Sequence, residues 1–376
     1  MKITLAMDSY KGSLKAQEAC DIMEKALLER IPNAIVFKHP MADGGEGTVE
    51  ALVNATKGHI VYHKVQDIFG EEISGYYGVL GDGKWAVIES ATASGIENIP
   101  KGQLNPMKAC SYGTGQLILL ALQAGYENII IGFGGTASSD GGMGALSALG
   151  LRFLDEKNKE VWASGENMIK VKSIDTKALY PKLKSANLLF ACDVQNPYYG
   201  KDGAAYVYAP QKGASKDEVV LLDAGLQNLA QVFKETFNKD ISNIPSSGAA
   251  GGLSGGLMAI TEPNIMSGFD IVAKYSGLED SIAKSDFVFS GEGKTDSQTV
   301  KGKVPFKAGL LAKKYNKPLI CISGTISPDA EVLKDYGVTA LFSIVSGPMT
   351  LRKSIRNTKK LLYRQTINIA DLLALL

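Results

Sequence analysis

Strand and helix patterns alternate at the start of the chain. Ile3–Met7 is an apolar run of the length of a buried strand, and apolar residues at helical spacing follow it over 16–27. A second apolar run, 34–37, comes next, which gives a β-α-β opening. We place the start of the first helix at Ser13, because serine is favoured as an N-cap. The opening predicts a parallel sheet with a right-handed crossover.

The same rhythm returns towards the C-terminus. The elements expected there are strands at 287–289, 319–322 and 340–344, and helices at 271–282, 307–315 and from 349 to the end.

The middle of the chain has a different texture. Its first three strands, 60–65, 73–79 and 84–89, are short and partly alternating, and Gly81-Asp82-Gly83 predicts a hairpin between the last two. Further strands are expected at 128–131, 151–154 and 188–192, and helices at 116–124 and 216–238. We therefore predict an α/β fold: a Rossmann-like parallel-sheet domain formed by both chain ends (1–62 and 264–376), and a second α/β domain (63–263) inserted into it.

Composition narrows the function classes. The chain has 376 residues, 45% of them hydrophobic, and a formal net charge of +1, so no global field favours nucleic acid or a membrane surface. Four scattered cysteines and three histidines argue against a zinc site or a Ser-His-Asp hydrolase. The N-terminal apolar run is too short for a signal peptide and no segment approaches a membrane span, so we expect a cytoplasmic protein.

Glycine is in excess, and it gathers in loops that follow strands. The chain has 41 glycines among its 376 residues, about 11%, whereas roughly 7% is usual. Gly132–Gly144 follows one strand and leads into a helix, whose unpaired N–H groups favour anions. Loops at the carboxyl ends of parallel strands are where ligands bind in open α/β sheets. Five such loops combine glycine with an acidic residue: Asp8, Asp43 with Glu46, Asp140, Asp193, and Glu292 with Asp296.

This combination fits phosphoryl transfer. Glycines bring backbone N–H groups to phosphates, carboxylates hold Mg²⁺ or accept a proton, and lysines neutralise transferring charge. The lysines placed for this are Lys11, Lys212, Lys294 and Lys303. The chain has neither a Walker A sequence nor a G-x-G-x-x-G fingerprint at its glycine loops, so a dinucleotide role is weakly supported.

Six segments together carry a family resemblance. They are Asp8–Leu14, Ala42–Thr48, Gly134–Gly142, Cys192–Val194 with Asn196-Pro197, Pro210–Ala214, and Gly291–Gly293 with Asp296–Gln298. In this order, over residues 1 to about 350, they resemble the bacterial type I glycerate kinase family. The resemblance implies ATP-dependent phosphorylation of D-glycerate with Mg²⁺, usually at the 2-hydroxyl, and a two-domain shape with the active site in the interdomain cleft. We expect a monomer or homodimer. The chain departs from the family's common residues at Met7, Ser139, Ala209 and Lys294. The change at Lys294 matters most, because the planar guanidinium of arginine binds a carboxylate or phosphate through two parallel hydrogen bonds, which the single amino group of lysine does not.

We assign candidate roles on this basis. The catalytic candidates are Asp193 or Asp296 as the base and Lys11 as a ligand of a phosphate or of the glycerate carboxylate. Substrate binding is assigned to Asp8, Ser9, Lys11, Gly251, Gly252, Glu292 and Lys294. ATP phosphates are assigned to Gly134, Gly135, Thr136, Ser138, Ser139, Asp140, Gly141, Gly142 and Lys212, and Mg²⁺ to Asp43 and Glu46.

Other interpretations stay open. Asp193 and Asp296 are residue types that also cap helices and turns, Glu46 can cap its helix, and Cys192 is expected to be a buried thiol rather than a nucleophile. Two other functions compete with the main one: a kinase for another small hydroxy acid on the same fold, and a nonenzymatic sensor of small anions. Five carboxylate loops argue against the sensor, because carboxylates repel an anion unless a metal or a proton transfer requires them.

Overall fold

The computed structural model describes residues 1–42, 44–45, 47–100 and 102–375. The chain forms two compact units. Unit 1 comprises Met1–Asp43, Glu50–Thr56 and Phe269–Leu376, and unit 2 comprises Gly44–Val49 and Lys57–Gly268. The boundary expected after residue 62 falls inside a strand, His59–Gln66, that belongs entirely to unit 2.

Unit 1 is built on a five-stranded parallel sheet. Its strands are β1 (Lys2–Met7), β2 (Ile35–Pro40), β11 (Phe287–Gly291), β13 (Leu319–Ser323) and β15 (Val338–Ser343), in the order β15-β13-β11-β1-β2. Every neighbouring pair is parallel. Counted along the unit, the order is 2-1-3-4-5, and the direction of winding reverses between β1 and β11. Ligands bind beyond the carboxyl ends of the strands at such a switch point.

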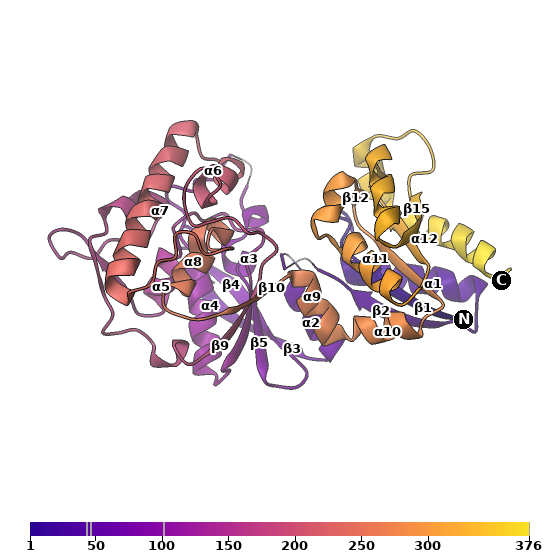
Figure 1. The fold of residues 1–376 in the computed structure, drawn as a ribbon, viewed down its shortest axis with the longest axis horizontal. Helices are drawn as coiled ribbons and strands as arrows, with labels where there is room; N and C mark the ends of the chain where they lie inside the picture. The colour runs from indigo at the N-terminus through magenta and orange to yellow at the C-terminus, as the bar shows by residue number, and fades with distance from the viewer. Residues whose placement is uncertain (43, 46, 101, 376) are drawn as a thin grey trace. The chain divides into compact units, whose positions relative to one another are not determined.

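Helices cover both faces of this sheet (Figure 1). The helices of unit 1 are α1 (Ala16–Arg30), α9 (Gly268–Ser276), α10 (Leu278–Lys284), α11 (Val304–Lys314) and α12 (Leu351–Leu373). Alternate residues of β1, Ile3, Leu5 and Met7, are fully buried in a core shared with α1 and α12. Thr4 faces the other way and its hydroxyl lies 2.7 Å from that of Ser285, which follows α10. The period-2 alternation of β1 thus divides its side chains between two helical layers.

Unit 2 contains a six-stranded mixed sheet in the order β10-β9-β6-β5-β4-β3. Its strands are β3 (His59–Gln66), β4 (Glu72–Val79), β5 (Trp85–Glu89), β6 (Asn128–Gly132), β9 (Asn187–Ala191) and β10 (Asn264–Met266). The last four run parallel, whereas β3, β4 and β5 form an antiparallel meander. Smaller pairs are β7 (Arg152–Leu154) with β8 (Ser173–Asp175) in this unit, and β12 (Lys294–Thr295) with β14 (Thr325–Ile326) in unit 1.

The core of unit 2 lies between this sheet and a layer of helices. The helices are α3 (Ala91–Ser94), α4 (Tyr112–Gln123), α5 (Met143–Ala148), α6 (Ala204–Tyr208), α7 (Lys216–Phe237) and α8 (Leu253–Met258), and α2 (Thr48–Thr56) runs from unit 2 into unit 1. Short 3₁₀ turns precede several loops, among them η4 (Pro210–Lys212), η5 (Ala249–Gly252) and η6 (Ser297–Lys301). Ser215 caps α7 by accepting a hydrogen bond from the N–H of Glu218.

The predicted α/β architecture is confirmed, including a parallel sheet formed by both chain ends and a second sheet inserted between them. Three local predictions are wrong. The first helix begins at Ala16 with Lys15 as its N-cap, while the Ser13 hydroxyl donates to the carbonyl of Tyr10 instead. The helix expected over 271–282 is broken at Gly277, whose φ of +69° ends α9 and starts α10. The third error is the absence of β10 from the expected strands.

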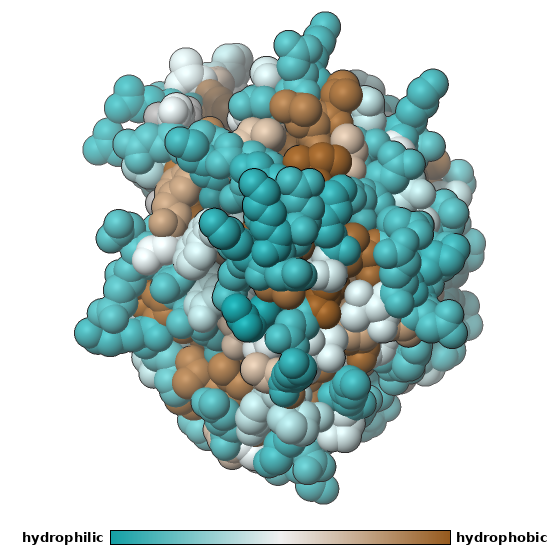
Figure 2. Space-filling model, turned by 90° about the vertical axis from the view of Figure 1, so that its left-hand side faces the viewer, coloured by the Kyte–Doolittle hydropathy of each residue, from teal (hydrophilic) through white to brown (hydrophobic). Residues whose placement is uncertain are grey.

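Among the described residues, no helix is both long enough and apolar enough to cross a membrane. Figure 2 shows that hydrophilic side chains cover most of the face turned to the viewer, with apolar ones in small groups among them. The exposed apolar residues of unit 2 include Val220 and Leu221 on α7.

Candidate active site

In unit 1 two of the predicted loops leave the sheet at its switch point. Met7 and Gly291 are paired at the ends of β1 and β11, and the N–H of Asp8 donates to the carbonyl of Gly291 at 2.9 Å. A Cβ on Gly293 would lie 3.2 Å from the backbone nitrogen of Lys11, so the second loop packs directly on the first. The structure therefore brings the segments 8–11 and 291–296 together.

The loop at Asp8 is fixed by its own backbone. The N–H of Ser9 donates to Asp8 Oδ1 at 2.6 Å, and the buried Tyr10 hydroxyl donates to the carbonyl of Ile322 at the end of β13. Lys11 next to them is exposed. Tyr10 thus anchors the loop while the neighbouring polar side chains remain at the sheet edge.

The carboxylate of Glu292 in unit 1 is buried, with 5% of the residue's surface exposed. Its Oε1 accepts hydrogen bonds from the hydroxyls of Thr295 at 3.1 Å and Thr299 at 2.7 Å. Its Oε2 lies 3.2 Å from Lys303 Nζ. Burial raises the pKa of the Glu292 carboxyl, against the opposing effect of the hydroxyls and of Lys303.

Asp296 and Lys294 form an ion pair, with Oδ2 and Nζ 2.9 Å apart. Asp296 Oδ1 accepts a hydrogen bond from the N–H of Gln298 and caps η6. The contact with Lys294 lowers the pKa of the Asp296 carboxyl. The capping role that we weighed for Asp296 is therefore present in the structure.

In unit 2, loops after three parallel strands meet at the carboxyl edge of the sheet. Glu89 ends β5, the glycine loop follows β6, and Asp193 comes two residues after β9. Glu89 is buried, and its carboxylate accepts hydrogen bonds from the N–H groups of Val49 at 2.5 Å and Gly47 at 3.4 Å, at the start of α2. Asp193 Oδ2 accepts from the N–H of Gly268 at 3.2 Å.

The glycines of this edge are needed because backbones touch. A Cβ on Gly134 would lie 2.4 Å from the Cα of Gly45, and one on Gly44 3.1 Å from the carbonyl oxygen of Ala191. The loops that follow β2, β6 and β9 are therefore in direct contact. Gly135 has a φ of +72° and its carbonyl accepts the N–H of Ile96.

The two glycine-rich segments, 134–142 and 248–252, also contact each other. The N–H of Gly141 donates to the carbonyl of Gly251 at 3.0 Å, and a Cβ on Gly252 would lie 2.9 Å from the Cα of Gly141. Tyr198 is fully buried and its hydroxyl donates to the carbonyl of Gly141 at 2.7 Å. The sequence from Ala250 to Gly252 has positive φ throughout, which explains why small residues stand there.

We call the two contacting segments, 134–142 and 248–252, the glycine assembly. Asp140 stabilises it through internal hydrogen bonds. It is fully buried, and its Oδ2 accepts the N–H and the hydroxyl of Ser111 and the N–H of Gly144. Its Oδ1 accepts the N–H of Gly142 at 3.2 Å. These four hydrogen bonds give the Asp140 carboxylate a structural role at the start of α5.

The side chain of Lys212, the last residue of η4, contacts the glycine assembly. Its side chain is buried, and Nζ donates to the carbonyl of Ser138 at 2.5 Å and to the hydroxyl of Thr136 at 3.5 Å. A Cβ on Gly251 would lie 3.1 Å from this Nζ. Burial lowers the pKa of the Lys212 amino group to about 7, although the negative charge of Asp140 acts in the opposite direction.

Three serine hydroxyls at these loops are buried without a hydrogen-bond partner in the described part of the chain: Ser138, Ser139 and Ser247. Buried polar atoms are normally paired, so an orphaned group calls for a missing partner such as water or a ligand. These hydroxyls mark the interior of the glycine assembly as polar.

The metal-ligand candidates Asp43 and Glu46 lie outside the described residues. Within the described ranges, no group of three or more His, Cys, Asp or Glu side chains is arranged to hold a metal ion. Mg²⁺ bound to a nucleotide needs only one or two protein carboxylates, because phosphate oxygens and water complete its shell.

Sequence reasoning did not select Glu89, Ser111, Thr295 or Thr299, although each contacts a loop of the candidate site. Glu89 is the last residue of the strand expected at 84–89, after apolar residues, and this was the available signal. The hydroxyl residues gave none. Ser111 is 29 residues from Asp140 in the chain. Thr295 and Thr299 follow Glu292 by three and seven residues, but only the folded loop brings their hydroxyls onto its carboxylate.

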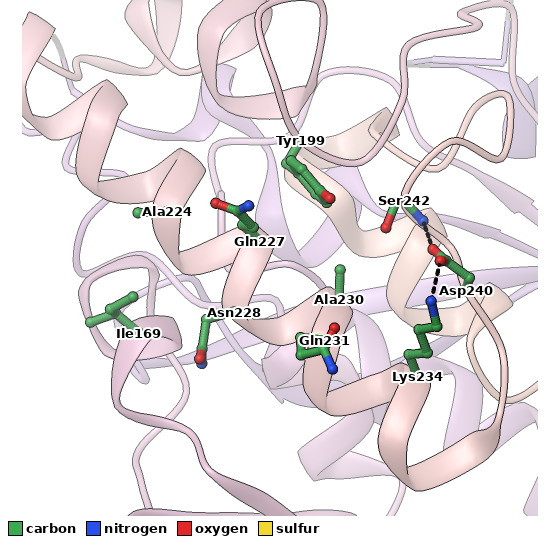
Figure 3. A pocket seen from close by; sticks show the side chains of 10 residues that line it. All are labelled: Ile169, Tyr199, Ala224, Gln227, Asn228, Ala230, Gln231, Lys234, Asp240 and Ser242. Atoms are coloured by element: carbon green, nitrogen blue, oxygen red, sulfur yellow. Dashed lines mark hydrogen bonds and ion pairs between the residues drawn. The ribbon is translucent and has the colours of Figure 1, made fainter.

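A hollow of about 510 Å³ lies beside α7, lined by side chains that include Tyr199, Gln227 and Lys234 (Figure 3). None of its lining residues is one of the candidate site residues. Its two charged side chains form an ion pair, with Lys234 Nζ 2.9 Å from Asp240 Oδ2, and Asp240 Oδ1 accepts a hydrogen bond from the backbone N–H of Ser242. We therefore keep the candidate site at the sheet edges.

Comparison with known proteins agrees with this architecture. A crystal structure of a candidate glycerate kinase 2 from Salmonella typhimurium LT2 superposes with a TM-score of 0.87 at 41% identity, covering 99% of this chain and 98% of that chain. Glycerate 2-kinase of Escherichia coli K12 is 42% identical over 375 residues, which is 100% of this chain and 98% of the relative. Glycerate kinase of Haemophilus influenzae Rd is 39% identical over 374 residues, with 100% and 99% covered.

The match to a family description is equally extensive. The model of the glycerate kinase family matches residues 3–374. Both the family match and the relatives span nearly the whole chain, so they include both units and every loop described above. The chain belongs to the glycerate kinase family.

Proposed function

We propose that this protein transfers the γ-phosphoryl group of ATP to the 2-hydroxyl of D-glycerate and forms 2-phosphoglycerate. The observation that carries the proposal is the full-length similarity, at 42% identity, to a glycerate 2-kinase. The candidate residues supply what phosphoryl transfer needs, namely positioned backbone donors, cations and a carboxylate near the acceptor hydroxyl.

The phosphates of ATP are assigned to the glycine assembly of unit 2. Gly134, Gly135, Gly141 and Gly142 keep the backbone bare of side chains, while Thr136, Ser138 and Ser139 offer hydroxyl groups and Lys212 a cation. Backbone N–H groups near a helix start favour phosphate oxygens. Asp140 contributes by holding the loop, through its four internal hydrogen bonds.

Glycerate is assigned to the segments 8–11 and 291–296 of unit 1, with Gly251 and Gly252 as further candidates. Glycerate is a small anion with one carboxylate and two hydroxyls. Lys11 and Lys294 suit the carboxylate, and Asp8, Ser9 and Glu292 suit the hydroxyls. Lys294 carries its charge on an exposed side chain paired with Asp296, so its grip on a carboxylate is weaker than that of a bidentate arginine.

For the base we favour Asp193 over Asp296. A base accepts a proton efficiently when its pKa lies near the working pH. The ion pair with Lys294 lowers the pKa of Asp296, which makes this carboxylate the poorer acceptor. Asp193 is exposed and comes two residues after the end of β9, at the carboxyl edge of the unit 2 sheet.

We assign Mg²⁺ to Asp43 and Glu46, in company with the triphosphate. A magnesium ion bound there would neutralise phosphate charge during the transfer. The steps that involve this chain's own residues are the binding of phosphates by the glycine assembly, the orientation of glycerate by unit 1 and the acceptance of the hydroxyl proton by Asp193.

Phosphorus NMR of the product tests the proposal. The protein is incubated with ATP, Mg²⁺ and D-glycerate, and the product is compared with authentic 2- and 3-phosphoglycerate. We expect 2-phosphoglycerate, with L-glycerate and tartronate as poorer acceptors. An absence of turnover on D-glycerate would overturn the assignment of substrate, and 3-phosphoglycerate would overturn the regiochemistry.

The base is tested separately. Asp193→Asn should lower kcat by about 10²- to 10⁴-fold, the usual contribution of a general base, while ATP binding changes little. Asp296→Asn serves as the comparison and should cost less. The reverse order of the two variants would move the role to Asp296.

A further inference from the structure

The amino group of Lys212 has an unusual set of neighbours for a lysine. It is 2% exposed, and among the described residues no carboxylate oxygen lies within ion-pair distance of Nζ. Its two hydrogen-bond acceptors are neutral, the carbonyl of Ser138 and the hydroxyl of Thr136. A buried charge without an ionic partner is costly unless the group becomes neutral or gains a counter-ion.

A protonated Lys212 also has more donors than acceptors. An ammonium group carries three N–H donors, and two acceptors are within reach. The hydroxyls of Ser138 and Ser139 on the adjoining loop are buried and have no partner in the described structure. One cationic donor and two orphaned hydroxyls thus occur on the same pair of segments, which an oxyanion would satisfy together.

The lack of a side chain at Gly251 lets its backbone approach Lys212 and the loop at Ser138 closely. Its missing Cβ would stand 3.1 Å from Lys212 Nζ, 2.3 Å from the carbonyl oxygen of Ser138 and 2.7 Å from the Cα of Ser139. The three segments that carry Lys212, Ser138–Ser139 and Gly251 therefore converge on one point.

We propose that Lys212, with the hydroxyls of Ser138 and Ser139, binds one oxyanion of a substrate, and that its amino group takes up a proton from solvent as the anion binds. The inference deepens the proposed function, on which it rests, by making the charge of this site depend on its ligand. The balance is simple: the neutral amine gains H⁺ from water, and the resulting ammonium forms an ion pair with the anion.

The electrostatics of the site support the proton uptake. Burial lowers the pKa of Lys212 to about 7, and Asp140 is the charged group in the described structure that acts against this. A bound anion adds negative charge and raises the pKa of Lys212 again. At pH 8, above this pKa, most unliganded molecules carry a neutral Lys212, so binding takes up a proton.

Calorimetry measures this uptake directly. ADP and D-glycerate are titrated separately into the whole protein at pH 6 and pH 8, in buffers of different ionisation enthalpy. We expect uptake of more than about half a proton at pH 8 and a clearly smaller uptake at pH 6. Uptake with ADP assigns the oxyanion to a phosphoryl group, and uptake with D-glycerate assigns it to the carboxylate. Uptake with neither ligand overturns the proposal.

Two variants separate a binding role from a structural one. Lys212→Met should remove the proton uptake, and retention of the uptake would contradict us. The double variant Ser138→Ala/Ser139→Ala should weaken about tenfold the binding of whichever ligand, ADP or D-glycerate, brings the proton uptake. It should not lower the midpoint of urea unfolding, because the two hydroxyls have no partner in the described structure. Ser164→Ala is the matched control, since it removes another buried, unpartnered hydroxyl and should leave binding unchanged.

The failure of this inference can be told from failure of the proposed function. If D-glycerate is phosphorylated but neither ligand brings a proton with it, the kinase assignment stands and the role of Lys212 falls. If ADP binds with proton uptake but D-glycerate is not phosphorylated, the site stands and the substrate assignment falls.

Discussion

Asp140 accepts two hydrogen bonds from Ser111, although 29 residues separate them: one from the backbone N–H at 2.7 Å and one from the hydroxyl at 2.8 Å. Two further bonds, from Gly142 and Gly144, complete the carboxylate. The Asp140 side chain is fully buried, and its two oxygens accept all four of these bonds. The glycine assembly consequently has an internal brace that no ligand needs to supply.

Asp140→Asn should therefore destabilise the protein. An amide keeps one oxygen acceptor but turns an NH₂ group towards backbone donors, which leaves buried donors unpaired. We expect a loss of about 2 to 5 kcal/mol in the free energy of unfolding, measured by urea denaturation. Asp82→Asn provides the control, because Asp82 accepts one bond in an exposed turn and should change stability by less than about 0.5 kcal/mol. Equal effects at both positions would show that the brace contributes nothing.

Gly251→Ala and Gly277→Ala form a matched pair, because the two glycines have φ of +68° and +69°. At Gly277 nothing lies within 4 Å of an added Cβ, so only the left-handed backbone opposes alanine, at about 1 to 2 kcal/mol. At Gly251 the Cβ would also meet a backbone oxygen at 2.3 Å. Overpacking of this kind adds about 1 to 3 kcal/mol. The difference between the two unfolding free energies measures the close approach itself, and equal losses would argue against it.

The four cysteines should be unreactive in the native protein. Each is buried, and burial raises the pKa of Cys20 and Cys321 to about 12 and that of Cys110 and Cys192 above the usual value. Because the thiolate is the reacting form, a thiol reagent at pH 8 should label none within minutes and four after denaturation. Rapid labelling of one thiol in the native state, with loss of activity, would return Cys192 to consideration as a reactive group.

Much of the fold could be predicted from apolar runs. The strands that became β1, β6 and β11 are continuous apolar segments ending in glycine or polar loops, and their burial on both faces produces that signal. β10 gives no such signal, because it is a three-residue edge strand with two exposed residues. The break at Gly277 is also hidden, since the apolar periodicity continues on either side of it.

The candidate site was predictable as a set of loops but not as a set of contacts. That carboxylates follow strands is visible in the sequence, and parallel strands place them at one edge. Two features depend on pairings between residues far apart in the chain. Ser111 hydrogen-bonds the carboxylate of Asp140, and Gly44–Val49 belongs to unit 2 although it follows a strand of unit 1. The roles of Asp193 and Asp296 stay predictions, now with their capping contacts described.

Glu292 and Glu218 should show pH effects of opposite sign. Burial raises the pKa of Glu292 above 4.5, so the folded protein binds that proton more tightly than the unfolded chain, and this stabilisation is lost as pH rises through the raised pKa. Glu292→Gln should thus gain stability relative to the parent between pH 4.5 and 7. At Glu218, hydrogen bonds from Ser215 lower the pKa of the carboxyl, so the stabilisation that these bonds give is lost as pH falls. Glu218→Gln should therefore be less stable than the parent near pH 7 and approach the parent near pH 4. Urea unfolding of all three proteins across this range measures both trends. A falling difference for Glu292→Gln would mean that its ion pair with Lys303 outweighs burial.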